Sequence, residues 1–96
     1  MEFEWGESKD STNRQQHGLA FSEAAERFQW NNEYLEIFDA DHSEDEDRFI
    51  AIGPIARGLI VVIYTEPEEG VVRNISAREA TRREQALFRD RMERNR

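Results

Sequence analysis

Four strand-like segments follow one another in the middle of the chain, and they constrain the fold more than any other feature. Each is rich in aromatic and β-branched residues, which favour extended backbone, and turn-forming residues separate it from the next. The segments are Tyr34–Phe38, Arg48–Ala56, Leu59–Thr65 and Val71–Ile75, with turns at Arg57-Gly58 and at Pro67–Gly70. The sequence therefore predicts consecutive antiparallel strands.

The N-terminal third predicts one more strand and two helices. Glu2–Trp5 alternates acids with aromatics, the period of a half-buried strand. Glu7–Gln16 is polar and free of proline and glycine, which predicts a surface helix closed by Gly18. Glu23–Phe28 places its apolar residues on one face, so we expect a short helix there, capped by Ser22.

The C-terminal segment predicts a last helix. Ser76 and Glu79 have the spacing of a capping box, in which each side chain accepts a hydrogen bond from the other's backbone N–H. We therefore expect the helix to begin at this point. The resulting order, β-α-α-β-β-β-β-α, predicts an α+β fold with a mostly antiparallel sheet and packed helices, in a single domain that covers residues 1–96.

Length and composition limit the class of protein. Ninety-six residues suffice for one core, and the absence of cysteine excludes disulfides and thiolate metal sites. The acidic N-terminus does not resemble a signal peptide, and Leu59–Tyr64, the longest apolar run, is too short to span a bilayer. We expect a cytoplasmic protein that makes no contact with membranes.

Charge is distributed unevenly along the chain. The net charge is -8, which by itself argues against extensive binding of nucleic-acid phosphates. Residues 1–76 contain 17 acids and 6 bases, whereas residues 77–96 contain 4 acids and 7 arginines. A basic surface is therefore expected near the C-terminus.

An acidic stretch runs from Glu33 to Asp47 and contains eight carboxylates. Its alternating aspartates resemble the start of an EF-hand loop. Glu44 replaces the glycine that such a loop requires at its sixth position, and Ile50 replaces the glutamate at its twelfth. We favour a solvated loop over a calcium site, and a patch that docks a basic partner is the other alternative.

Four arginines are the most informative charged residues. The predicted helix start gathers Arg73, Arg78, Arg82 and Arg83 around a helix N-terminus, which itself attracts phosphate. Cations at this end oppose the helix dipole, so their placement favours a role beyond helix formation. Neutralisation of nearby acids is the structural alternative.

The chain resembles the BrnT family, the toxins of BrnT/BrnA toxin-antitoxin pairs, over nearly its whole length. The matching segments are Phe3–Trp5, Asn13, His17-Gly18, Phe21, Glu23-Ala24, Phe28, Arg48–Gly53, Val62–Thr65 and Arg73–Glu84. The junction Ile75–Arg78 is the most specific of them. The chain departs from the family at Gly6, where an acid is usual, and at Gln16, where lysine is usual.

The resemblance implies a RelE-like toxin fold, cleavage of RNA, and neutralisation by a BrnA-type antitoxin. The ribbon-helix-helix part of that antitoxin would bind operator DNA, so this chain would meet DNA only indirectly. No metal or cofactor is expected, because a base, an acid and cations suffice for RNA cleavage.

Six residues are candidates for these roles. We expect Arg73 and Arg78 to hold the scissile phosphate, because guanidinium is planar, bidentate and permanently charged. His17 would transfer a proton, and Lys9, Arg48 and Arg83 would help to bind RNA. The alternative is a non-catalytic module that uses the same surface to bind a protein or a nucleic acid.

Overall fold

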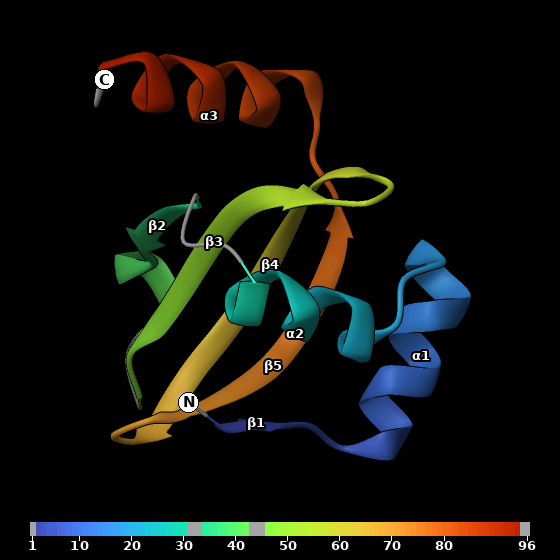
Figure 1. The fold of residues 1–96 in the computed structure, drawn as a ribbon. Helices are drawn as coiled ribbons and strands as arrows, with labels where there is room; N and C mark the ends of the chain where they lie inside the picture. Colours follow the sequence, from blue (N-terminus) through green and yellow to red (C-terminus); the bar gives the residue numbers. More distant parts are fainter. Residues whose placement is uncertain (1, 31–33, 43–45, 95–96) are drawn as a thin grey trace.

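A mixed five-stranded sheet organises the part of the chain that the structure describes (Figure 1). The structure is a computed structural model that describes residues 2–30, 34–42 and 46–94. Its elements are β1 (Glu2–Glu4), α1 (Glu7–His17), α2 (Phe21–Trp30), β2 (Leu35–Phe38), a 3-10 turn (Ala40–His42), β3 (Arg48–Ile55), β4 (Gly58–Glu68), β5 (Val71–Glu79) and α3 (Arg82–Arg94). The expected α+β class is confirmed. Residue 33 and residues 43–45 of the acidic stretch lie outside the described residues.

The strand order in the sheet is β1-β5-β4-β3-β2. Strands β2 to β5 pair antiparallel with their neighbours in sequence, as predicted. Only β1 runs parallel to its partner, β5, in the described part of the sheet. Its connection to the other strands passes through α1 and α2, which allows the parallel arrangement.

The last hairpin is longer than the sequence predicted. Strand β4 continues to Glu68, past the expected turn at Pro67, and the chain reverses next to Gly70, where φ is +82°. Strand β5 continues to Glu79, which pairs with Ile60 across the ladder. The prediction that a helix begins at Ser76 is therefore wrong, because pairing with β4 outweighs the local capping signal.

The two N-terminal helices lie close to their predicted positions. Gly18 ends α1 in the left-handed conformation, with φ of +66°, and its N–H donates to the carbonyl of Arg14 at 2.9 Å, as expected. Helix α2 begins at Phe21, so the prediction that Ser22 caps it is wrong. The carboxylate of Asp10, on α1, accepts from the N–H of Phe21 at 2.8 Å instead.

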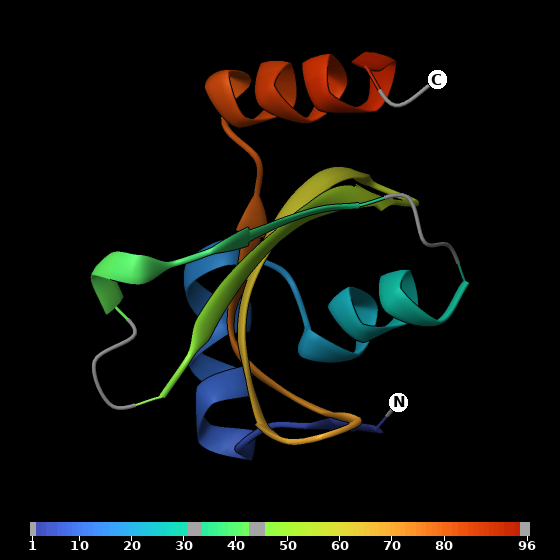
Figure 2. The same ribbon diagram turned by 90° about the vertical axis from the view of Figure 1, so that its left-hand side faces the viewer.

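Each face of the sheet has its own apolar core. Leu19, Phe21 and Ala24 pack with Val62 and Tyr64 on one face. On the other face, Phe88 and Met92 of α3 pack against a cluster formed by Leu35, Ile52, Val61 and Ala80. Figure 2 shows the sheet nearly edge-on, with α2 on one side and α3 across the other. Of the described helices, none has the length and apolar character that crossing a membrane requires.

Asn13 attaches α1 to the edge of β5. Its side chain is buried, and its Nδ2 donates to the carbonyls of Leu19 and Ala77, both at 2.8 Å. Its Oδ1 accepts from the N–H of Ala77 at 3.0 Å. The side-chain amide thus pairs with the β5 backbone as a neighbouring strand would, and it fixes α1 beside the sheet.

Candidate functional site

One row of polar side chains crosses the sheet on the face opposite α2. Pairing aligns Glu4 of β1 with Arg73 of β5, Arg73 with Thr65 of β4, and Thr65 with Arg48 of β3. Residues aligned in this way point to the same face. The row lies beyond the apolar cluster that α3 covers. The structure therefore brings together Arg73 and Arg48, two of the predicted site residues.

Arg73 is exposed and paired with an acid. Its Nε and Nη2 lie 3.1 Å and 3.0 Å from Oε1 of Glu4, and both side chains are nearly half exposed. Exposed pairs of this kind contribute little to stability, since water screens both charges. A phosphate that approaches this face can therefore compete with Glu4 for the guanidinium.

Arg78 lies on the same face of β5 as Arg73. It pairs with Val61, whereas Arg73 pairs with Thr65, and alternate residues of β4 share a face. The expected position of Arg78 in the first turn of a helix is therefore wrong. We call the surface formed by Arg48, Arg73 and Arg78 the arginine face.

A bidentate ion pair joins Arg78 to the start of α3. Nη1 and Nη2 of Arg78 donate to Oε1 and Oε2 of Glu84 at 2.7 Å and 2.8 Å. Glu84 also belongs to a capping box, in which its Oε1 accepts from the N–H of Thr81 at 2.9 Å. The hydroxyl of Thr81 accepts from the N–H of Glu84 at 3.2 Å. The predicted capping box of Ser76 and Glu79 is therefore wrong, and a different one, Thr81 with Glu84, forms five residues later.

The contacts between Arg78 and Glu84 shift the pKa values of both side chains. Hydrogen bonds from Arg78 are the main reason that the pKa of Glu84 falls to about 2, and partial burial opposes this shift. The hydrogen bonds with Glu84 raise the pKa of Arg78. Both groups are therefore charged at neutral pH, and they form a stable link between β5 and α3.

This link predicts a pH-dependent contribution to stability. Because folding lowers the pKa of Glu84, the contribution is complete above about pH 4.5, the pKa without the pair, and is lost as the pH falls towards 2. Allowing for solvent screening, we expect wild type to exceed Glu84→Gln by roughly 1 kcal/mol in unfolding free energy at pH 7. Urea unfolding of both proteins between pH 7 and pH 2 measures the difference. A difference that stays constant with pH would contradict the assignment to Glu84.

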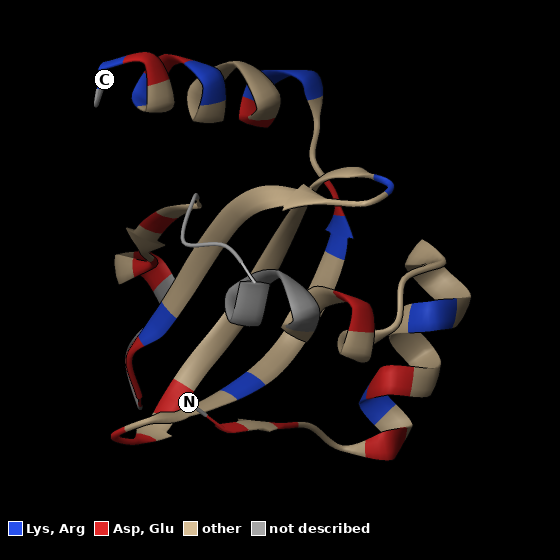
Figure 3. Ribbon diagram, viewed as in Figure 1, with Lys and Arg blue, Asp and Glu red and all other residues tan. Residues whose placement is uncertain are grey.

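The remaining C-terminal arginines lie on α3. Arg82 and Arg83 occupy its first turn and are exposed. Arg73 lies near the other end of β5, so the expected gathering of Arg73, Arg78, Arg82 and Arg83 around one helix start is wrong. Figure 3 shows basic and acidic segments alternating along α3.

Lys9 and His17, the candidates on α1, lie apart from each other. Lys9 lines a groove of about 260 Å³ between α1 and β5, together with Gln16 and Ser76. His17 is the exposed last residue of α1 and does not line this groove. The groove adjoins the arginine face through Ser76, which shares that face with Arg78. Lys9 is therefore better placed than His17 to contact a ligand on the arginine face.

Two buried hydroxyl groups escaped the sequence analysis. Thr65 lies between Arg48 and Arg73 in the row described above. On the opposite face, Tyr64 donates to Glu36, and burial is the main cause that raises the pKa of Tyr64. Strand alternation could place both residues on a sheet, but it could not identify their neighbours, because these depend on register.

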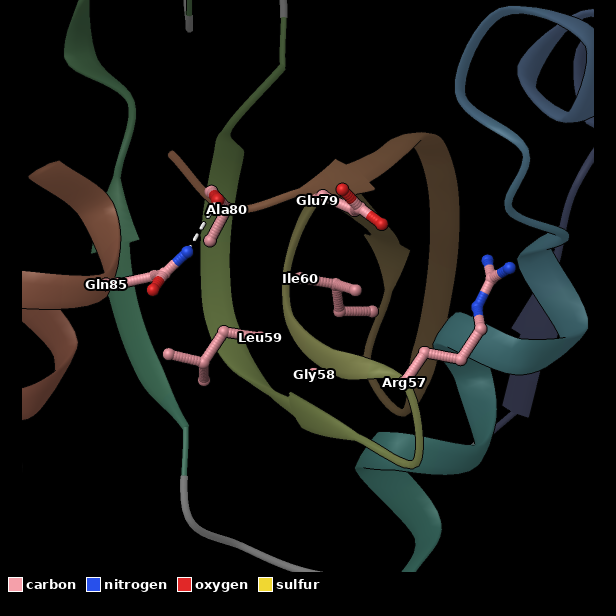
Figure 4. A pocket seen from close by; sticks show the side chains of 7 residues that line it. All are labelled: Arg57, Gly58, Leu59, Ile60, Glu79, Ala80 and Gln85. Atoms are coloured by element: carbon pink, nitrogen blue, oxygen red, sulfur yellow. Dashed lines mark hydrogen bonds between the residues drawn. The ribbon is translucent and has the colours of Figure 1, made fainter. Parts of the chain in front are cut away.

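A second hollow, also of about 260 Å³, lies between the β3–β4 turn and the start of α3 (Figure 4). The side chain of Gln85 spans one wall and donates to the carbonyl of Ala80 at 3.2 Å. Arg57 at its rim turns towards α1 and α2, where it contacts Gly18 and Glu23. None of the predicted site residues lines this hollow.

Comparisons with known proteins connect this geometry to a family. A family model described as the ribonuclease toxin BrnT of type II toxin-antitoxin systems matches residues 5–84. The fold is similar to the 1.1 Å crystal structure of the Brucella abortus ribonuclease toxin BrnT, with a TM-score of 0.68 and 28% sequence identity. That match covers 85% of this chain and 99% of the other. A search of curated proteins found no match.

Proposed function

The chain belongs to the BrnT family of ribonuclease toxins of type II toxin-antitoxin systems, and from this premise we propose that its arginine face binds and cleaves RNA. The observation that carries the proposal is the register that aligns Arg48 and Arg73 and places Arg78 on the same face. Three guanidinium groups on one face of a rigid sheet offer bidentate donors to successive backbone phosphates.

The proposed reaction is metal-independent endonucleolytic cleavage. The 2′-oxygen attacks the neighbouring phosphorus, the bond from phosphorus to the 5′-oxygen breaks, and the products carry a 2′,3′-cyclic phosphate and a 5′-hydroxyl. Arg73 and Arg78 stabilise the charge that develops on the phosphoryl oxygens. Lys9, Arg48 and Arg83 bind the flanking phosphates. His17 is proposed to accept the proton of the 2′-hydroxyl, and solvent supplies the proton that the departing 5′-oxygen gains.

The proposed partner is a BrnA-type antitoxin with a ribbon-helix-helix part. Membership of a type II family implies an antitoxin that neutralises the toxin. Such a partner would cover the arginine face, and operator DNA would be bound by the antitoxin rather than by this chain. A RelE-like fold and a location in the cytoplasm, where RNA and antitoxin are available, belong to the same proposal.

The experiment that tests this function uses antitoxin-free protein and end-labelled single-stranded RNA in EDTA. We expect cleavage in EDTA, because no step requires a metal ion. The fragments should end in a cyclic phosphate, because the 2′-oxygen is the attacking atom. Addition of the proposed BrnA-type antitoxin should suppress their formation. Intact RNA after prolonged incubation would favour the alternative, a binding module without catalytic activity. In that case the protein should still slow the migration of the RNA in a native gel.

A further inference from the structure

Thr65 carries a buried hydroxyl that the fold does not use. The residue is 1% exposed, and its Oγ1 has no hydrogen-bond partner among the described residues. Most buried polar atoms in folded proteins are paired, so an unpaired one requires a physical explanation. Valine has nearly the same shape and would fill this position in β4 without the penalty of an unsatisfied hydroxyl.

The neighbours of Thr65 point to an anion as the missing partner. Register places Arg73 on one side of Thr65 and Arg48 on the other, all three on the same face. Adjacent strands are about 4.8 Å apart, so the two arginine Cα atoms are roughly 10 Å apart. Arginine side chains are long enough to reach a phosphate group above Thr65 from both neighbouring strands, although Arg73 is paired with Glu4 in the free protein.

We propose that Thr65 donates its hydroxyl proton to an RNA backbone phosphate that Arg48 and Arg73 hold between them. This inference rests on the proposed binding of RNA and adds a neutral donor at the floor of the site. In the free protein the hydroxyl is buried, so the side chains that cover it must move when the phosphate enters. Arg73 then exchanges Glu4 for the phosphate, which its exposed position permits.

Asn74 also has unpaired buried side-chain atoms, but it does not share this environment. Both amide atoms of Asn74 are without hydrogen-bond partners in the described part of the chain. Asn74 pairs with Tyr64, whose side chain packs on the opposite face with Leu19 and Phe21. An anion at Thr65 therefore cannot reach Asn74, and the inference concerns Thr65 alone.

The test compares Thr65→Val, which removes the hydroxyl, with Thr65→Ser, which keeps it. The probe is a fluorescent 2′-O-methyl RNA oligonucleotide, which lacks the attacking hydroxyl and therefore reports binding without cleavage. We expect Thr65→Val to raise Kd about tenfold, the effect of losing one hydrogen bond to a charged group, and Thr65→Ser to stay within about threefold of wild type. Fluorescence anisotropy at fixed salt measures both values.

Thermal stability is the second readout, because Thr65→Val should stabilise the fold while it weakens binding. Because Thr65→Val removes an unpaired buried polar group, we expect its Tm to rise by a few degrees, roughly 4 °C. A merely structural threonine would give no change in Kd. An unchanged Kd in Thr65→Val, or a lower Tm, would overturn the inference.

The two proposals fail in different ways. If wild type binds the 2′-O-methyl RNA and Thr65→Val binds it less tightly, the phosphate site stands even if no RNA is cleaved. If wild type cleaves RNA and Thr65→Val binds the probe as tightly as wild type does, catalysis stands and the role of Thr65 is overturned. Absence of binding by folded wild type would overturn both.

Discussion

Arg78→Ala is expected to lower the rate of RNA cleavage by about 100-fold or more, whereas Glu84→Gln should cleave at least as fast as wild type. Removing one charge-stabilising donor from an active site has an effect of this size. Glu84 occupies the same edge of the guanidinium that a phosphate would use. Neutralising Glu84 weakens this internal competitor and leaves Arg78 in place. Single-turnover cleavage of a labelled RNA measures both rates.

The pair of variants separates two roles for Arg78. If Arg78 only attaches α3 to β5, the two variants remove the same ion pair and should lower the cleavage rate equally. Arg94→Ala is a matched control, since Arg94 forms an exposed ion pair with Asp90 within α3. We expect this control to cleave at the wild-type rate. Equal losses in Arg78→Ala and Glu84→Gln would contradict a catalytic role for Arg78.

Local sequence signals were sufficient to predict those elements that depend mainly on residues close together in the chain. The alternation in Glu2–Trp5, the Gly18 terminus and the strand-rich middle segment all led to elements close to those observed. The start of α3 was different, because the sequence offers two capping boxes, Ser76 with Glu79 and Thr81 with Glu84. Only the second forms, since residues 76–79 pair with β4. That competition depends on residues some 15 positions away, which no local motif contains.

The residue types of the candidate site could be predicted from the sequence, but not their arrangement. The excess of arginine in residues 77–96 drew attention to the segment that contains Arg78, and Arg73 precedes this segment by a few positions. Both remain predicted site residues. Their expected gathering at a helix start failed, because both lie on β5. The alignment of Arg73 with Arg48 follows from two ladders and from irregular pairing next to Tyr64 and Thr65. Register of this kind is set by packing of the whole sheet, so spacing along the chain could not reveal it.

Asn13→Ala is expected to lower the unfolding free energy by roughly 3 kcal/mol, a large part of the 5–15 kcal/mol that is typical of small domains. Three buried hydrogen bonds end on this one amide. Their loss leaves the carbonyl of Leu19 and both polar groups of the Ala77 backbone without partners inside the protein. Alanine favours helix, so helix propensity opposes the loss and cannot explain it.

Ser11→Ala is the control, because Ser11 is a polar residue on the same helix whose side chain is exposed. We expect urea unfolding of this control to stay within about 0.5 kcal/mol of wild type. Asn13→Asp keeps one acceptor but loses both donors and buries a charge, so it should destabilise at least as much as alanine at pH 7. Since Asn13 holds α1 against β5, Asn13→Ala and Asn13→Asp should also loosen the groove that contains Lys9. A loss below about 1 kcal/mol in Asn13→Ala would show that the edge of β5 finds other partners, and that contacts other than those of the Asn13 amide hold α1 in place.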